Sequence, residues 1–158
     1  MELILTAFFL LVIPLFTLFF FKSNGGILFL AACAGIVLLN SLDPVVVTTA
    51  GAIVPGEGEA YIRLAVVMLS VVFAGLVFRR TIKGSALILN GLIVIFTSLM
   101  LWVTLPGATG VSWLIDSIDS EVWIRANDFS TLIIAAGLSL SLVSLLIGQK
   151  KEHKKSKH

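Results

Sequence analysis

Long uncharged apolar stretches, separated by short charged segments, recur along the chain and constrain its fold more than any other feature. Because each helical residue rises about 1.5 Å, roughly 20 apolar residues cross a hydrocarbon core about 30 Å thick. The stretches are continuously apolar, whereas the strands of a membrane barrel alternate, so they predict helices. We expect an all-α bundle of five transmembrane helices, with spans at 3–21, 26–42, 60–78, 85–105 and 129–148.

The composition supports the same class. Of the 158 residues, 58% are hydrophobic and 13% are charged, against about 45–50% and about 25% in soluble domains. A chain of this size has too little interior to hide such an apolar excess from water. We therefore expect one membrane domain over 1–148 and a basic tail over 149–158.

Basic residues fix the expected orientation. With five spans, Lys22, the cluster at 79–83 and the lysines of the tail lie on one face, and only Arg63 and Arg125 lie on the other. Four spans would separate Lys22 from the 79–83 cluster. Since Lys and Arg are retained on the cytoplasmic side, we expect the N-terminus outside and the C-terminus in the cytoplasm. The default location is a bacterial inner membrane.

Two outer segments carry helical signals of their own. Asp43-Pro44 ends the second span, because Asp caps helices and Pro favours a first helical position. The segment 43–55 then either forms a short interfacial or re-entrant helix, or prolongs the second span through a proline kink. In the second segment, Val111, Leu114, Ile115, Ile118 and Val122 recur at helical steps, which predicts an amphipathic helix over 111–124 on the outer face.

Small and polar residues form ladders in the last two spans. One ladder is Gly84, Asn90, Gly91, Thr97 and Ser98; the other is Thr131, Ala135, Gly137, Ser139 and Ser141. The four-residue step from Thr131 to Ala135 and Ser139 also joins Ala31 to Gly35 and Ser70 to Ala74. In lipid, helices associate through close contact at small residues and through hydrogen bonds between helices. The ladders predict helix packing, within one copy or between copies; a polar pore lining is the alternative.

Arg63 lies a little way into its span and is the ionisable residue nearest to a transmembrane core, and Asp43 at the outer interface is the other candidate polar residue. An interfacial cap is expected for Asp43, and a substrate or ion site at a broken helix is the alternative. Arg63 is expected to reach the interface or to pair with an outer acid such as Glu59. A substrate role is the alternative for Arg63.

The tail contains Lys150, Lys151, Lys154, Lys155 and Lys157. Such a cluster beside an anionic leaflet attracts lipid headgroups, and the alternative is a solvated tail that only fixes the orientation. Nucleic-acid binding is not expected, because no aromatic platform accompanies the charge.

The sequence favours a non-catalytic membrane protein. We expect no catalytic residues, no cofactor and no metal site, since the single Cys33 lies in an apolar stretch and no histidine lies near a span. The spans also contain few ionisable groups, which ion pumps and proton-coupled transporters need. We predict an accessory, scaffold or assembly component that contacts lipids and either itself or a larger membrane protein. A small oligomeric transporter or channel subunit is the alternative.

Overall fold

The computed structural model describes residues 2–52, 58–79, 87–116, 118 and 121–155. It describes side chains for 10–49, 51–52, 58–79, 88–112, 114–116, 118 and 121–147. In this part of the chain every regular element is a helix, which confirms the predicted all-α class. The helices are α1 (Glu2–Phe21), α2 (Gly25–Ser41), α3 (Pro44–Gly51), α4 (Gly58–Val77), α5 (Leu87–Thr109), α6 (Ser112–Ile115), α7 (Glu121–Asp128) and α8 (Ser130–Lys155).

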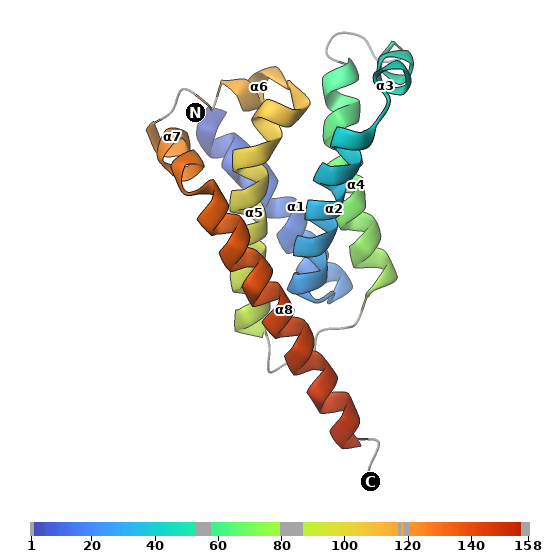
Figure 1. Ribbon diagram of the computed structural model, residues 1–158, viewed down its shortest axis with the longest axis vertical. Helices are drawn as coiled ribbons and strands as arrows, with labels where there is room; N and C mark the ends of the chain where they lie inside the picture. Colours follow the sequence, from blue (N-terminus) through green and yellow to red (C-terminus); the bar gives the residue numbers. More distant parts are fainter. Residues whose placement is uncertain (1, 53–57, 80–86, 117, 119–120, 156–158) are drawn as a thin grey trace.

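Three of the described helices are long and apolar enough to cross a membrane, over Gly58–Val77, Ile88–Thr109 and Ser130–Ile147. The shorter apolar helices Leu10–Phe21 and Gly25–Ser41 lie beside them. Figure 1 shows these long helices running between the same two ends of the molecule, with α8 slanting across the bundle towards the C-terminus.

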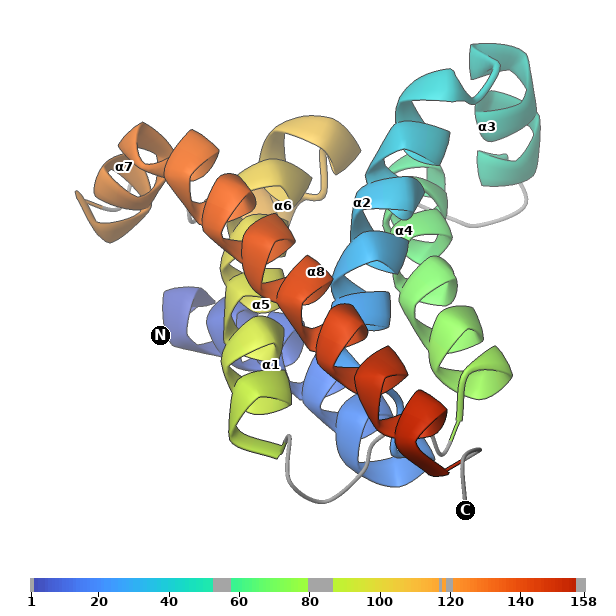
Figure 2. The same cartoon turned by 60° about the horizontal axis from the view of Figure 1, so that its bottom comes forward.

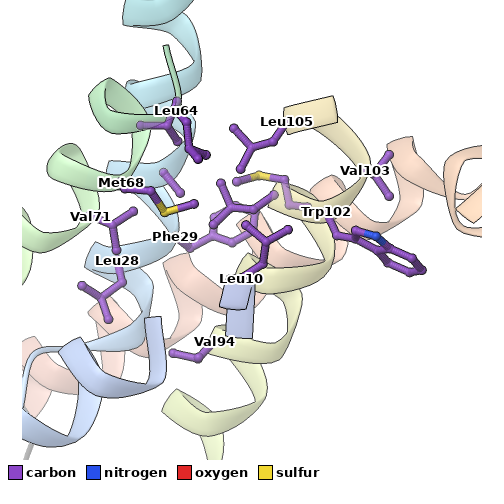
Figure 3. Packing of buried hydrophobic residues seen from close by; sticks show 14 of the residues in the cluster. Leu10, Leu28, Phe29, Leu64, Met68, Val71, Val94, Trp102, Val103 and Leu105 are labelled. Atoms are coloured by element: carbon purple, nitrogen blue, oxygen red, sulfur yellow. The ribbon is translucent and has the colours of Figure 1, made fainter. Parts of the chain in front are cut away.

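The core forms where α1, α2, α4 and α5 meet. Figure 3 shows Leu10, Phe29 and Met68 among the apolar side chains that converge there from these helices. Gly35 brings α2 close to α4, because a Cβ at this position would lie 3.1 Å from the Ser70 Cβ. The small residues noted in these two spans therefore mark a real helix crossing.

The segment after α2 is a separate helix. α2 ends at Ser41, and α3 begins at Pro44 after the Asp43 carboxylate accepts a hydrogen bond from the Val45 N–H at 2.8 Å. In both views α3 lies beside α4 (Figures 1 and 2), and Val47 is buried. The structure thus does not show a kinked extension of α2.

The predicted amphipathic helix over 111–124 is wrong as a single element. α6 ends at Ile115 and α7 starts at Glu121. Val111 and Leu114 are fully buried in the bundle, whereas Val122 is exposed, so the two ends of the apolar stripe have different environments. The Trp123 indole N–H donates to the Trp102 carbonyl at 3.2 Å, which ties α7 to α5.

The ends of the last two long helices also differ from the prediction. α5 continues beyond Leu105 through Pro106 to Thr109. Pro106 has no N–H to donate to the Trp102 carbonyl four residues earlier, and the Trp123 indole N–H donates to that carbonyl instead, at 3.2 Å. α8 continues past 148 into the basic segment as far as Lys155.

Candidate functional site

A buried polar junction lies where α2 begins between α5 and α8. The first N–H groups of a helix have no partner inside that helix. Two side-chain oxygens supply partners here: the Asn24 Oδ1 accepts from the Gly26 N–H at 2.8 Å, and the Asn90 Oδ1 accepts from the Gly25 N–H at 2.7 Å. Asn24 therefore caps α2 from its own chain segment, and Asn90 caps it from α5.

Ser144 connects α8 to this junction. Its hydroxyl lies 3.1 Å from the Asn24 Oδ1 and 3.5 Å from the Asn90 Oδ1. A hydroxyl has one proton, so it donates chiefly to the closer oxygen of Asn24. The exposed fractions of Asn24, Asn90 and Ser144 are 8%, 0% and 3%. One polar side chain from each of three segments is thus buried and hydrogen-bonded within the protein.

Two glycines make this contact sterically feasible. A Cβ on Gly25 would lie 2.7 Å from the Asn90 carbonyl oxygen, and a Cβ on Gly26 would lie 2.8 Å from the Ser141 carbonyl oxygen. Both neighbours are backbone atoms of other helices, so they cannot rotate away. Any larger residue at either position would separate α2 from α5 or α8.

The side chains of the junction hold helices together. Amide and hydroxyl side chains do not titrate near neutral pH, so the junction supplies no acid or base. Its groups are also directed at one another and at the first turn of α2. The arrangement joins three helices.

The predicted ladder of α5 largely faces this interior. Asn90, Thr97 and Ser98 are buried, and the two hydroxyls donate to the Ile93 and Val94 carbonyls at 2.9 and 3.0 Å. Gly91 differs, because a Cβ there would meet no atom within 4 Å. Gly84 lies outside the described residues.

The predicted ladder of α8 divides between two opposite faces. Gly137 and Ser141 are buried, and a Cβ on Gly137 would overlap the buried ring of Phe29. Thr131, Ala135 and Ser139 are exposed. At 100° per residue these three positions lie on the side of α8 opposite to the junction. Because these three side chains are exposed in a single copy of the chain, their packing against another helix stays a prediction about contacts between chains.

The two candidate polar residues, Asp43 after the end of α2 and Arg63 near the start of α4, lie in separate environments. Asp43 is exposed and caps α3. The Arg63 guanidinium donates to the Glu59 carboxylate at 2.7 Å, four residues earlier on α4, which is the pairing expected from the sequence. This ion pair lines a cavity of about 370 Å³ beside the end of α5 at 107–110.

The side chains of the tail lysines, Lys150, Lys151, Lys154, Lys155 and Lys157, lie outside the described residues, so their contact with lipid stays a prediction. Within the described part of the chain, no group of three or more His, Cys, Asp or Glu side chains is placed to hold a metal ion.

Sequence reasoning missed four members of the junction: Asn24, Gly25, Gly26 and Ser144. An asparagine followed directly by two glycines is a recognisable helix start that allows close approach. Ser144 lies three residues after Ser141, which places both on one face of α8. Both signals are local, and neither identifies the helix that would be contacted.

Comparison of the chain with known protein families, with curated proteins and with solved structures found no match.

Proposed function

We propose that this chain crosses the membrane five times, through α1, α2, α4, α5 and α8, with its C-terminus in the cytoplasm of a bacterial cell. α1 has 20 residues, enough for about 30 Å of helix. The figures support this arrangement, because successive long helices run in alternating directions between the two ends (Figures 1 and 2).

The charges support the proposed orientation. Lys22 follows α1 and Arg79 follows α4, and they line one cavity at one end of the bundle. Glu59 and Asp43 belong to the segments at the opposite end of α2 and α4. Cationic residues on one side are typical of the cytoplasmic face.

Within that membrane the protein acts non-catalytically, as an accessory or assembly component that binds a second copy or a larger membrane protein. The exposed face of α8 carries this proposal. Only 22% of the apolar segment Ser130–Ile147 of α8 is buried, against 56% for an apolar segment of the same length within Ile88–Thr109 of α5. Thr131, Ala135 and Ser139 lie in the middle of its exposed face.

The physical reason is the way helices associate in lipid. Without a hydrophobic driving force, close backbone contact through small residues supplies the attraction. The Ser139 hydroxyl donates to the Ala135 carbonyl at 2.8 Å, so it is satisfied inside α8. The side chains of this ladder are short, and the Ser139 hydroxyl needs no partner on another helix, so a second helix can pack closely against them.

The test is to replace a small ladder residue by a large one. Ala135→Leu adds bulk on the exposed face without a clash inside the bundle, and Ala34→Leu makes the same change at an exposed alanine of α2. Purification in mild detergent followed by mass spectrometry identifies the partner, and cross-linking measures association. We expect Ala135→Leu to reduce association and Ala34→Leu to leave it unchanged.

A transport function gives a different result. Solute flux into proteoliposomes that is lost in Asp43→Asn, with association unaffected by Ala135→Leu, would contradict the proposal.

A further inference from the structure

An apolar groove of about 390 Å³ runs between α1 and α4. Val12, Phe16 and Phe21 line it from α1, and Ala65, Met68 and Leu69 line it from α4. Phe16 and Leu69 are among the exposed hydrophobic residues. The groove is therefore open on the side that faces lipid in the proposed membrane placement.

A second cavity, of about 250 Å³, adjoins the groove at the proposed cytoplasmic end. Phe20, Phe21, Lys22 and Arg79 line it. Phe21 lines both cavities, so the apolar groove leads directly to two cationic side chains. The Phe20 and Phe21 rings meet edge to face with centroids 5.3 Å apart, and they form an aromatic wall beside the cations.

The backbone of Lys22 adds an independent observation. Its φ is 52°, in the left-handed region, directly after the last residue of α1. Glycine is the usual residue at this position, because a side chain there is strained. Strained residues gather at ligand-binding positions. A lysine at this turn places a positive charge at the end of the groove at a cost that glycine would avoid.

The charge at this end is not neutralised by the neighbouring described residues. Lys22 and Arg79 are both exposed. Within the described part of the chain the ion pairs are Arg63–Glu59 and Arg125–Glu121, which lie on other segments. Two unneutralised cations at the end of an apolar groove match a ligand with an anionic head and an apolar chain.

We propose that the surface between α1 and α4 binds one anionic phospholipid of the inner leaflet. Its phosphate contacts Lys22 and Arg79, and an acyl chain lies along the groove past Phe21. This site is separate from the lysines of the tail. It rests on the membrane placement in the proposed function, but not on the contact surface of α8.

Native mass spectrometry of the full chain in mild detergent tests this site, with phosphatidylglycerol and phosphatidylcholine supplied in equal amounts. We expect the protein to retain phosphatidylglycerol preferentially. Lys22→Gln with Arg79→Gln should reduce that preference about twenty-five-fold, roughly fivefold for each cation. Arg125→Gln, which removes an exposed cation from α7, should leave the preference unchanged.

Two further variants separate binding from folding. Lys22→Gly relieves the left-handed strain, so it should keep or raise the thermal stability while lowering the preference about fivefold. Ala65→Trp fills the groove and should reduce retention of both lipids. A folded double variant with an unchanged preference would overturn the proposal. So would displacement of the lipid by inorganic phosphate alone, or loss of the preference only when the tail lysines are replaced by serine.

Failure here is distinguishable from failure of the proposed function. If the protein inserts into bilayers and Ala135→Leu impairs association, but no lipid preference exists, only the lipid site is contradicted. If the protein does not partition into bilayers at all, both proposals fail.

Discussion

α5 and α8 contain similar ladders of small and polar residues, yet the two helices use them in opposite ways. In α5 the ladder residues Asn90, Thr97 and Ser98 are turned into the bundle and buried. In α8 the ladder residues Thr131, Ala135 and Ser139 are turned outwards, whereas Gly137 and Ser141 of the same ladder face the bundle together with Ser144.

The difference shows that a small-residue pattern predicts a contact without identifying the partner. A central helix such as α5 finds its partners within the same chain, whereas a peripheral helix such as α8 keeps a second face exposed. If this comparison is correct, substitutions on the inner ladder and at the junction should alter stability. Substitutions on the outer ladder should alter only association.

The largest effect is expected at Gly26. A side chain there would overlap the Ser141 backbone, so Gly26→Leu should lower the free energy of unfolding by about 4 kcal/mol. Denaturant unfolding in micelles measures this. Gly107→Leu is the control, because a Cβ on Gly107 meets nothing within 4 Å. Equal losses in the two variants would show that α2 does not contact α8 as described.

Asn90→Leu should cost about 2–3 kcal/mol. The change removes the acceptor of the Gly25 N–H and leaves that donor buried without its partner. Asn40→Leu is a matched control at an exposed asparagine of α2, where little change is expected. If unfolding in micelles shows Asn90→Leu to be as stable as the Asn40 control, the junction does not stabilise the bundle.

Ser144→Ala should have a smaller effect, about 0.5–1 kcal/mol, because hydrogen bonds between helices in membranes contribute modestly. It removes the hydroxyl that donates to Asn24. Ser139→Ala, on the exposed face of the same helix, should change stability by less than about 0.5 kcal/mol. Thermal melts measure the loss of stability in the two variants. A larger loss for Ser139→Ala than for Ser144→Ala would contradict the assignment of the two faces of α8.

The smallest effect is expected at Gly91, where added bulk meets nothing. Gly91→Ala should leave stability within about 0.5 kcal/mol or raise it slightly through helix propensity. Gly35→Ala makes the same change where a Cβ would lie 3.1 Å from the Val67 Cα, so it should be destabilising. A larger loss at Gly91 than at Gly35 would mean that the exposed side of α5 is covered in the functional protein.

The sequence located helices well wherever charge and proline interrupt the apolar stretches. The predicted span 26–42 and the observed Gly25–Ser41 differ by one residue at each end, because the polar residues before Gly25 and the Asp43-Pro44 pair interrupt the apolar stretch locally. The segment 111–124 was mispredicted, since Val111 and Leu114 are held by the bundle and Trp123 by the Trp102 carbonyl. Those are tertiary contacts, which a periodic pattern does not contain.

The polar junction was accessible from the sequence only in part. The cost of exposing an amide to lipid predicted that Asn90 faces another helix. The partner, the start of α2, lies 65 residues away. Nothing in the spacing of either segment specifies that pairing. The spacing also does not indicate that the α5 ladder is largely buried while part of the α8 ladder is exposed.

Labelling of single cysteines from each side of the membrane tests the proposed placement of the five helices most directly. In a Cys33→Ala background, Lys22→Cys, Arg79→Cys, Asp43→Cys and Glu121→Cys introduce thiols at exposed positions. We predict that an impermeant reagent outside the cell labels positions 43 and 121 only, and that positions 22 and 79 react only once the cytoplasmic face is opened. Labelling of positions 22 and 79 from opposite sides would contradict the account.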